Sequence, residues 1–172
     1  MARSKPSVIF SWNKACTLRK EIRERELKQE DFAVDLFLIV NKPASGGPFY
    51  CDPDQFFAIT YATENLRKFC SGTLARLAGR ADGVSLVNIA QTFGGGKTHA
   101  LGTLYYLCAL GAKLPQQHPA VREILAASQI PTPPAACIAA VSFDKVDWKA
   151  GGLVKSPDGE TRQFRMPWNL IA

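Results

Sequence analysis

The residues with the clearest chemistry are three consecutive glycines, Gly94, Gly95 and Gly96, followed directly by Lys97 and Thr98. Because glycine lacks a Cβ, such a run can curl tightly and point several backbone N–H groups at phosphate oxygens. The compact ammonium of Lys97 would then lie between the β- and γ-phosphates of a nucleotide, and the hydroxyl of Thr98 would be a ligand of Mg²⁺. The pattern predicts a loop that binds a nucleoside triphosphate.

The flanking segments are those that such a loop requires. Residues 84–90 contain a short apolar run that is typical of a strand buried on both faces of a parallel sheet. Its members, of which most are β-branched, are Val84, Leu86, Val87, Ile89 and Ala90. After Thr98, apolar residues recur at steps of three and four, and Gly111 stands where a helix would stop. The N-terminus of that helix would add unpaired donors and the positive end of its dipole. This order predicts an α/β fold of the P-loop NTPase class, a parallel sheet with flanking helices.

The loop departs from the usual pattern, G-x-x-x-x-G-K-[ST], at its beginning. Gln91 replaces the first glycine, whereas the Gly-Lys-Thr that would touch phosphate and metal is intact. Phe93, inside the loop, could pack against the domain or over the nucleotide. The alternative interpretation is a glycine-rich turn with an incidental Lys-Thr pair. The strand before the loop and the helix after it favour the nucleotide site.

The chain divides into two predicted regions. Residues 1–79 are expected to be a mainly helical N-terminal region, and residues 80–172 the start of a P-loop NTPase core. An amphipathic helix is predicted from an N-cap at Ser11 to Ile22. Residues 32–40 fit either a helix or a buried strand.

Two further helices are predicted between Pro53 and Leu77. Asp52 or Asp54 can cap the first helix, because Pro53 suits a first helical turn. A break between the two helices is expected near Thr63 or Ser71.

Downstream of the loop, residues 120–127 predict a short amphipathic helix and residues 136–143 a second parallel strand. Asp144, at the end of that strand, could be the carboxylate that holds Mg²⁺ through water, or it could simply cap a loop after a core strand. Residues 145–165 predict a hairpin-like excursion or an exposed loop, and residues 166–172 the first turns of another helix.

Composition excludes several classes of protein. The five cysteines are scattered, with no C-x-x-C pair, which fits neither a disulfide framework nor a zinc site and favours a reducing cytoplasm. No signal peptide is predicted, and the longest weakly polar stretch, residues 100–112, is too short to span a bilayer. The net charge of +6 would suit a phosphate-bearing partner, but the sequence favours a solvated basic surface as its explanation.

Two motifs together carry a family resemblance. The segment Tyr50-Cys51-Asp52-Pro53, with Phe56-Phe57 and Thr60-Tyr61, precedes QTFGGGKTHALGTLYYL. This combination resembles the opening of large bacterial ATPases of the "domain of unknown function four-nine-nine" family, which are similar to the ATPase of phage-growth-limitation defence systems. The resemblance implies an AAA-like, ATP-hydrolysing protein with Mg²⁺ as cofactor. It implies that Gly94–Gly96, Lys97 and Thr98 bind the nucleotide, with Lys97 in a catalytic role, and it extends to His99.

We therefore expect an ATP-binding segment of an ATPase that works with DNA or protein partners in a prophage or phage-defence assembly and could form a homo-oligomer. The sequence after the loop supplies neither a water-activating acid nor an arginine finger, so the chain is expected to be the N-terminal portion of a larger ATPase or a truncated reading frame. A small-molecule or nucleoside kinase would use the same loop. A kinase lid needs several arginines, however, and Arg122 is the only one between Lys97 and Arg162. A non-catalytic remnant is the third alternative.

Overall fold

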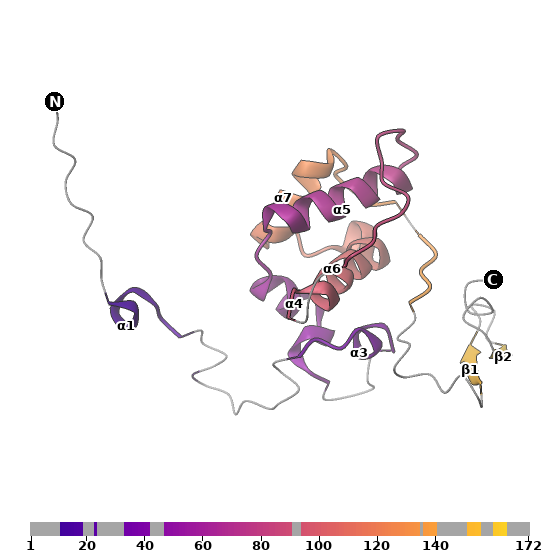
Figure 1. Cartoon of the computed structure of the whole chain (residues 1–172), viewed down its shortest axis with the longest axis horizontal. Helices are drawn as coiled ribbons and strands as arrows, with labels where there is room; N and C mark the ends of the chain where they lie inside the picture. The colour runs from indigo at the N-terminus through magenta and orange to yellow at the C-terminus, as the bar shows by residue number, and fades with distance from the viewer. Residues whose placement is uncertain are drawn as a thin grey trace.

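The described part of the chain is mostly helical. The computed structural model describes residues 11–18, 23, 33–41, 47–90, 94–134, 136–140, 151–155 and 160–164. Its longer helices are α4 (Pro53–Ile59), α5 (Glu64–Leu77), α6 (Lys97–Leu110) and α7 (Pro119–Ser128). Two shorter helices, α1 (Trp12–Ala15) and α3 (Leu36–Asn41), and two 3₁₀ turns, η2 (Phe49–Cys51) and η3 (Gly111–Lys113), complete the helical elements. In Figure 1, α6 lies between α3 on one side and the pair α5 and α7 on the other.

The two helices predicted between Pro53 and Leu77 are confirmed. The side chain of Asp52 caps α4 by accepting a 2.9 Å hydrogen bond from the Gln55 backbone N–H, and Pro53 occupies the first turn. The side chain of Thr63 caps α5 in the same way, accepting from the Leu66 N–H at 3.2 Å. The break between the helices therefore falls at residues 60–63, at the first of the two predicted places.

The helix that follows the glycines is also confirmed. α6 starts at Lys97 directly after Gly96, and it ends where Gly111 takes a φ of 51° that other residues rarely adopt. The amphipathic helix predicted at residues 120–127 is α7, which begins at Pro119 and ends at Ser128. Local sequence signals thus located both ends of α7 to within one residue and the end of α6 at Gly111.

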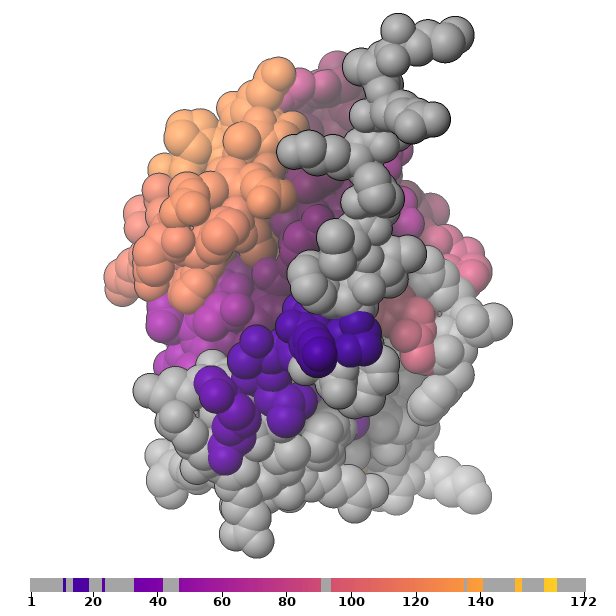
Figure 2. Space-filling model, turned by 90° about the vertical axis from the view of Figure 1, so that its left-hand side faces the viewer, coloured from indigo at the N-terminus to yellow at the C-terminus, as the bar shows by residue number. Residues whose placement is uncertain are grey.

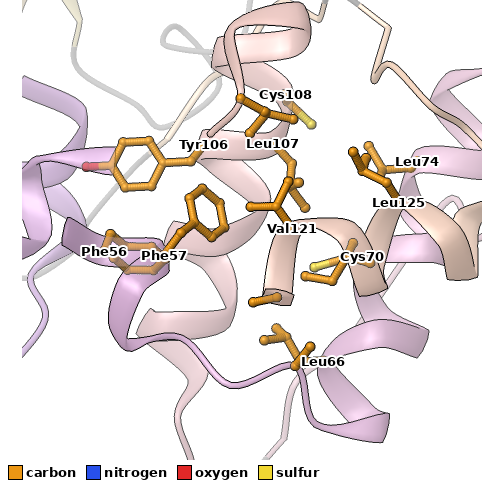
Figure 3. Close-up of a cluster of buried hydrophobic side chains, with 14 of the residues drawn as sticks. Phe56, Phe57, Leu66, Cys70, Leu74, Tyr106, Leu107, Cys108, Val121 and Leu125 are labelled. Atoms are coloured by element: carbon orange, nitrogen blue, oxygen red, sulfur yellow. The ribbon is translucent and has the colours of Figure 1, made fainter. Parts of the chain in front are cut away.

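One hydrophobic core joins these helices. Phe56 and Phe57 of α4 pack against Tyr106 of α6, with the Phe56 and Tyr106 ring centroids 5.2 Å apart. In Figure 3, Val121 of α7 lies between Leu107 of α6 and a third set of side chains from α5. The α5 set consists of Leu66, Cys70 and Leu74. The core therefore draws on residues from both sides of the predicted boundary between residues 79 and 80, and that division stays a prediction.

α3 approaches α6 closely at a glycine. A Cβ added to Gly102 would lie 2.9 Å from Cδ1 of Ile39 and 3.4 Å from Cζ of Phe56. Ile39 is fully buried there. Residues 32–40, which fitted a helix or a strand, therefore contribute a helix over Leu36–Asn41. The contact depends on the absence of a side chain at position 102.

α5 and α7 lie side by side and are joined at both ends. On the face shown in Figure 2, the orange surface of α7 adjoins the magenta surface of α5. Arg67 Nη1 donates to Glu123 Oε2 at 2.8 Å and to the Ala62 carbonyl at 2.7 Å. Farther along, Arg80 Nη1 donates to the Ser128 carbonyl at 3.1 Å. These contacts hold the two helices in register.

Among the described residues, the helix predicted from Ser11 to Ile22 is formed only at its start, and residues 19–22 lie outside the described part of the chain. α1 ends at Ala15, and residues 16–18 are not helical. Leu18, which should lie on the apolar face, is 65% exposed. An isolated helix is marginal in water unless its apolar face is buried, and no such burial is found at Leu18.

The predicted parallel sheet is not formed by the described residues. Residues 84–90 and 136–140 have no strand pairing, and Leu86 is 86% exposed. The only sheet in the described part of the chain is an antiparallel pair, β1 (Gly152–Lys155) and β2 (Thr161–Phe164), in which Gly152 faces Phe164. This pair confirms the hairpin-like excursion expected in residues 145–165. The P-loop fold stays a prediction, and Asp144 and residues 166–172 lie outside the described residues.

Candidate functional site

The glycines before α6 adopt backbone conformations that only glycine accepts readily. Gly94 has a φ of 83°, and Gly96 has a φ of 72° with a ψ of 15°, the left-handed region. A Cβ added at either position would meet no atom within 4 Å. Glycine is therefore required here by the turn of the backbone rather than by crowding, and the space beside the loop is open.

The loop leads directly into the N-terminus of α6. The first backbone hydrogen bond of this helix runs from the Ala100 N–H to the Gly96 carbonyl at 2.9 Å. The N–H groups of the preceding turn have no acceptor within the helix, as at every helix start. α4 and α5 each carry an acidic residue in the first turn, Asp54 and Glu64, whereas α6 has none. The positive end of the α6 dipole is thus not offset by a carboxylate of its own, which favours an anion there.

Lys97 and Thr98 are the first two residues of α6, and both are partly exposed. The structure therefore brings together Gly94, Gly95, Gly96, Lys97 and Thr98 at one helix end. Among the described residues, no group of three or more His, Cys, Asp or Glu side chains could hold a metal ion. Thr98 could contribute one oxygen to Mg²⁺, with phosphate and water as the other ligands. Phe93, predicted to contact the nucleotide, lies outside the described residues.

His99 faces α4 in the first turn of α6. Its ring stacks on Phe56 with centroids 4.6 Å apart and an interplanar angle of 17°. Its Nε2 lies 3.1 Å from Oγ1 of Thr60, the residue that ends α4. Burial lowers the pKa of His99, which keeps the ring neutral at physiological pH. His99 thus contacts α4, a role that its place in the motif did not predict.

Sequence reasoning missed the partners of His99. Phe56 and Thr60 were noted only as parts of the family resemblance, and no spacing rule connects them to a residue 39 positions away. The available signal was the presence of both the Phe56-Phe57 and Thr60-Tyr61 element and the glycine loop in one sequence.

Comparison with protein-family models shows to which family the chain belongs. The model of the DUF499 N-terminal domain matches residues 12–125, about two thirds of the sequence. The chain belongs to the DUF499 family. The matched DUF499 region includes α3 to α6, the glycine loop and most of α7. The expected family is therefore confirmed, and both Lys97 and the Thr60–His99 contact lie inside its domain.

No curated protein and no solved structure matches this DUF499 chain significantly. None of the described helices combines the length and the apolar character that crossing a bilayer requires.

Proposed function

We propose that this DUF499 domain binds ATP with Mg²⁺ through Gly94–Gly96, Lys97 and Thr98. One observation carries the proposal. Two glycines with positive φ, a lysine and a threonine lie together at the N-terminus of α6, whose first turn has no acidic residue. Backbone N–H groups would bind the phosphate oxygens, Lys97 would neutralise charge between the β- and γ-phosphates, and Thr98 would bind Mg²⁺. The predicted P-loop NTPase core is part of the same proposal.

The wider proposal is an AAA-like ATPase related to that of phage-growth-limitation defence. In such a protein Lys97 stabilises the charge that develops during phosphoryl transfer, and hydrolysis drives movement of DNA or protein partners. A homo-oligomer acting in the cytoplasm fits this role. The support is membership of the DUF499 family together with the loop geometry.

The test is equilibrium binding of a fluorescent ATP analogue, mant-ATP, with and without Mg²⁺. Replacing Lys97 with alanine removes a charge-assisted contact worth about 1.5–3 kcal/mol, so the Kd should rise by at least about tenfold. Thr98→Ala should remove the dependence on Mg²⁺ and leave the metal-free affinity nearly unchanged.

Lys113→Ala is the matched control, because Lys113 is an exposed lysine in the 3₁₀ turn that follows the far end of α6. It should bind mant-ATP like the parent protein. If Lys97→Ala and Lys113→Ala have the same Kd, the loop is a structural turn and the proposal is wrong. Release of phosphate from ATP, measured on the same samples, tests hydrolysis separately from binding.

A further inference from the structure

We propose that His99 is a positioning residue for the phosphate loop, acting through a hydrogen bond from its Nε2–H to Thr60 and through its stacking on Phe56. The inference deepens the proposed ATP site and rests on it. Its new content is that α4 sets the geometry of the loop, so that a residue outside the loop motif, Thr60, governs nucleotide affinity.

The hydrogen-bond network fixes the tautomer of His99. The Thr60 hydroxyl has one hydrogen, and it is donated to the Phe56 carbonyl at 2.7 Å. Thr60 Oγ1 can therefore only accept at its 3.1 Å contact with His99, so the proton lies on Nε2. Because burial keeps the ring neutral, Nδ1 carries the lone pair. The bond thus has a defined direction, from α6 to α4.

The stack fixes the plane of the same ring. Phe56 is fully buried, and it contacts Phe57 edge to face and Tyr106 at 5.2 Å. Phe56 cannot move without disturbing the core. The stack on Phe56 therefore fixes the plane of the His99 ring, and the bond to Thr60 fixes the direction in which Nε2 points. This is a rigid anchor for a residue only two positions after Lys97.

The anchor bears directly on the donors of the loop. His99 lies in the first turn of α6, directly after the glycines, and the backbone N–H groups of that turn have no acceptor within the helix. Its own carbonyl accepts from the Thr103 hydroxyl at 2.9 Å, which ties that turn to the next one. A shift of the His99 side chain would therefore move the whole array of donors relative to a bound phosphate, and small misplacements of such groups cost affinity.

The experiment compares mant-ATP affinity with thermal stability in a set of variants. His99→Phe keeps a stacked ring and removes the hydrogen bond, and Thr60→Val removes the acceptor. Each should raise the Kd by about threefold to tenfold, as expected for one hydrogen bond, and the double variant should be no worse than either single variant. His99→Gln, which can still donate to Thr60, and Thr60→Ser, which keeps the hydroxyl, should recover most of the affinity.

Thr73→Val is the matched control, because the Thr73 hydroxyl also donates to a carbonyl one turn earlier, at Phe69, in a helix away from the loop. It should leave the Kd unchanged whatever its effect on stability. Long-range ¹⁵N–¹H spectra of the His99 imidazole should show the proton on Nε2 in the parent protein. Thr60→Ser should show the same tautomer.

The outcomes separate the two proposals. If Lys97→Ala abolishes binding while His99→Phe and Thr60→Val keep the parent Kd, the ATP site stands and the positioning role is overturned. The same holds if Thr73→Val weakens binding as much as Thr60→Val at equal loss of stability. If the parent protein does not bind mant-ATP at all, both proposals are overturned.

Discussion

The phenol of Tyr106 donates a 2.9 Å hydrogen bond to the backbone carbonyl of Tyr50 inside the core. Both residues are almost fully buried, and the bond joins the middle of α6 to η2, 56 positions earlier in the chain. Burial raises the pKa of Tyr106 well above its usual value, so the hydroxyl keeps its proton and remains a donor at neutral and moderately alkaline pH. The bond therefore holds α6 against η2 over that whole pH range.

Tyr106→Phe should lower the free energy of unfolding by about 0.5–1.5 kcal/mol, because it removes one buried hydrogen bond. Chemical denaturation measures the change. The ring contacts with Phe56 and Phe57 remain in the variant, so the slope of the transition should not change. Tyr105→Phe provides the comparison, since the neighbouring ring is only partly buried. Equal effects of the two substitutions would contradict a special role for the Tyr50 contact.

Gly94→Ala and Gly96→Ala should each destabilise the protein by about 1–2 kcal/mol, because each alanine would be held at a positive φ. The cost comes from the backbone alone, since a Cβ at either site meets no neighbour. Gly96→Asn should cost less than Gly96→Ala, because asparagine tolerates the left-handed region better. Gly95, which is not among the glycines with positive φ, should accept alanine with little loss. Thermal unfolding of the four variants provides the ranking, and a Gly95 effect as large as that of Gly96 would show that the loop geometry is different.

The stability contributed by His99 should depend on pH in a defined direction. Burial lowers the pKa of His99 in the folded protein below the ordinary value of 6.5, so the unfolded chain takes up a proton first as the pH falls. The free energy of unfolding should therefore decrease as the pH falls through 6.5 toward the folded pKa, and the contribution is fully present above 6.5. Each unit of pKa displacement corresponds to about 1.4 kcal/mol.

Urea unfolding of the parent and of His99→Gln, between about pH 5 and about pH 8, isolates this contribution, because the other titrating groups are common to both proteins. The stability advantage of the parent over His99→Gln should be constant at the upper end and should shrink on acidification. An advantage that grows on acidification would mean that the ring is stabilised in its charged form.

The cysteines should differ sharply in reactivity. Cys16 and Cys137 are exposed, whereas Cys70 is fully buried and burial raises its pKa to about 12. Because the thiolate is the reactive form, iodoacetamide at about pH 8 should label the two exposed cysteines within minutes and leave Cys70 unmodified until the core opens. Peptide mass mapping measures the sites. Labelling of Cys70 that keeps pace with Cys137 would show that α5 is not held in the core.

The sequence predicted the elements whose signals are local. The side chains of Asp52 and Thr63 cap α4 and α5, and the backbone N–H of Gly111 bonds the Leu107 carbonyl at the end of α6. Such capping acts over three or four residues. The predicted strand at residues 84–90 is of a different kind. A run of β-branched residues becomes a strand only beside another strand, and pairing partners are chosen by long-range contacts that a single sequence does not display.

The same distinction explains what could be predicted of the candidate site. The glycines, Lys97 and Thr98 are adjacent in sequence, so their spacing alone indicated phosphate chemistry. The contact between Thr60 and His99 depends on how α4 and α6 pack, with Gly102 allowing Ile39 and Phe56 to lie against the helix. Packing of this sort is set by the whole core, and no rule of spacing anticipates it.

The packing of α6 also determines how the geometry of the loop is lost when the protein unfolds. Its buried residues contact neighbours drawn from nearly the whole helical assembly, with α3, α4, α5 and α7 all contributing. A synthetic peptide of the loop and its helix alone would lose this scaffold and, with it, the fixed array of amides. Heat, denaturant or a core substitution as distant as α7 should therefore abolish the proposed anion binding in the same cooperative transition that unfolds the protein, and not by gradual fraying of the loop alone.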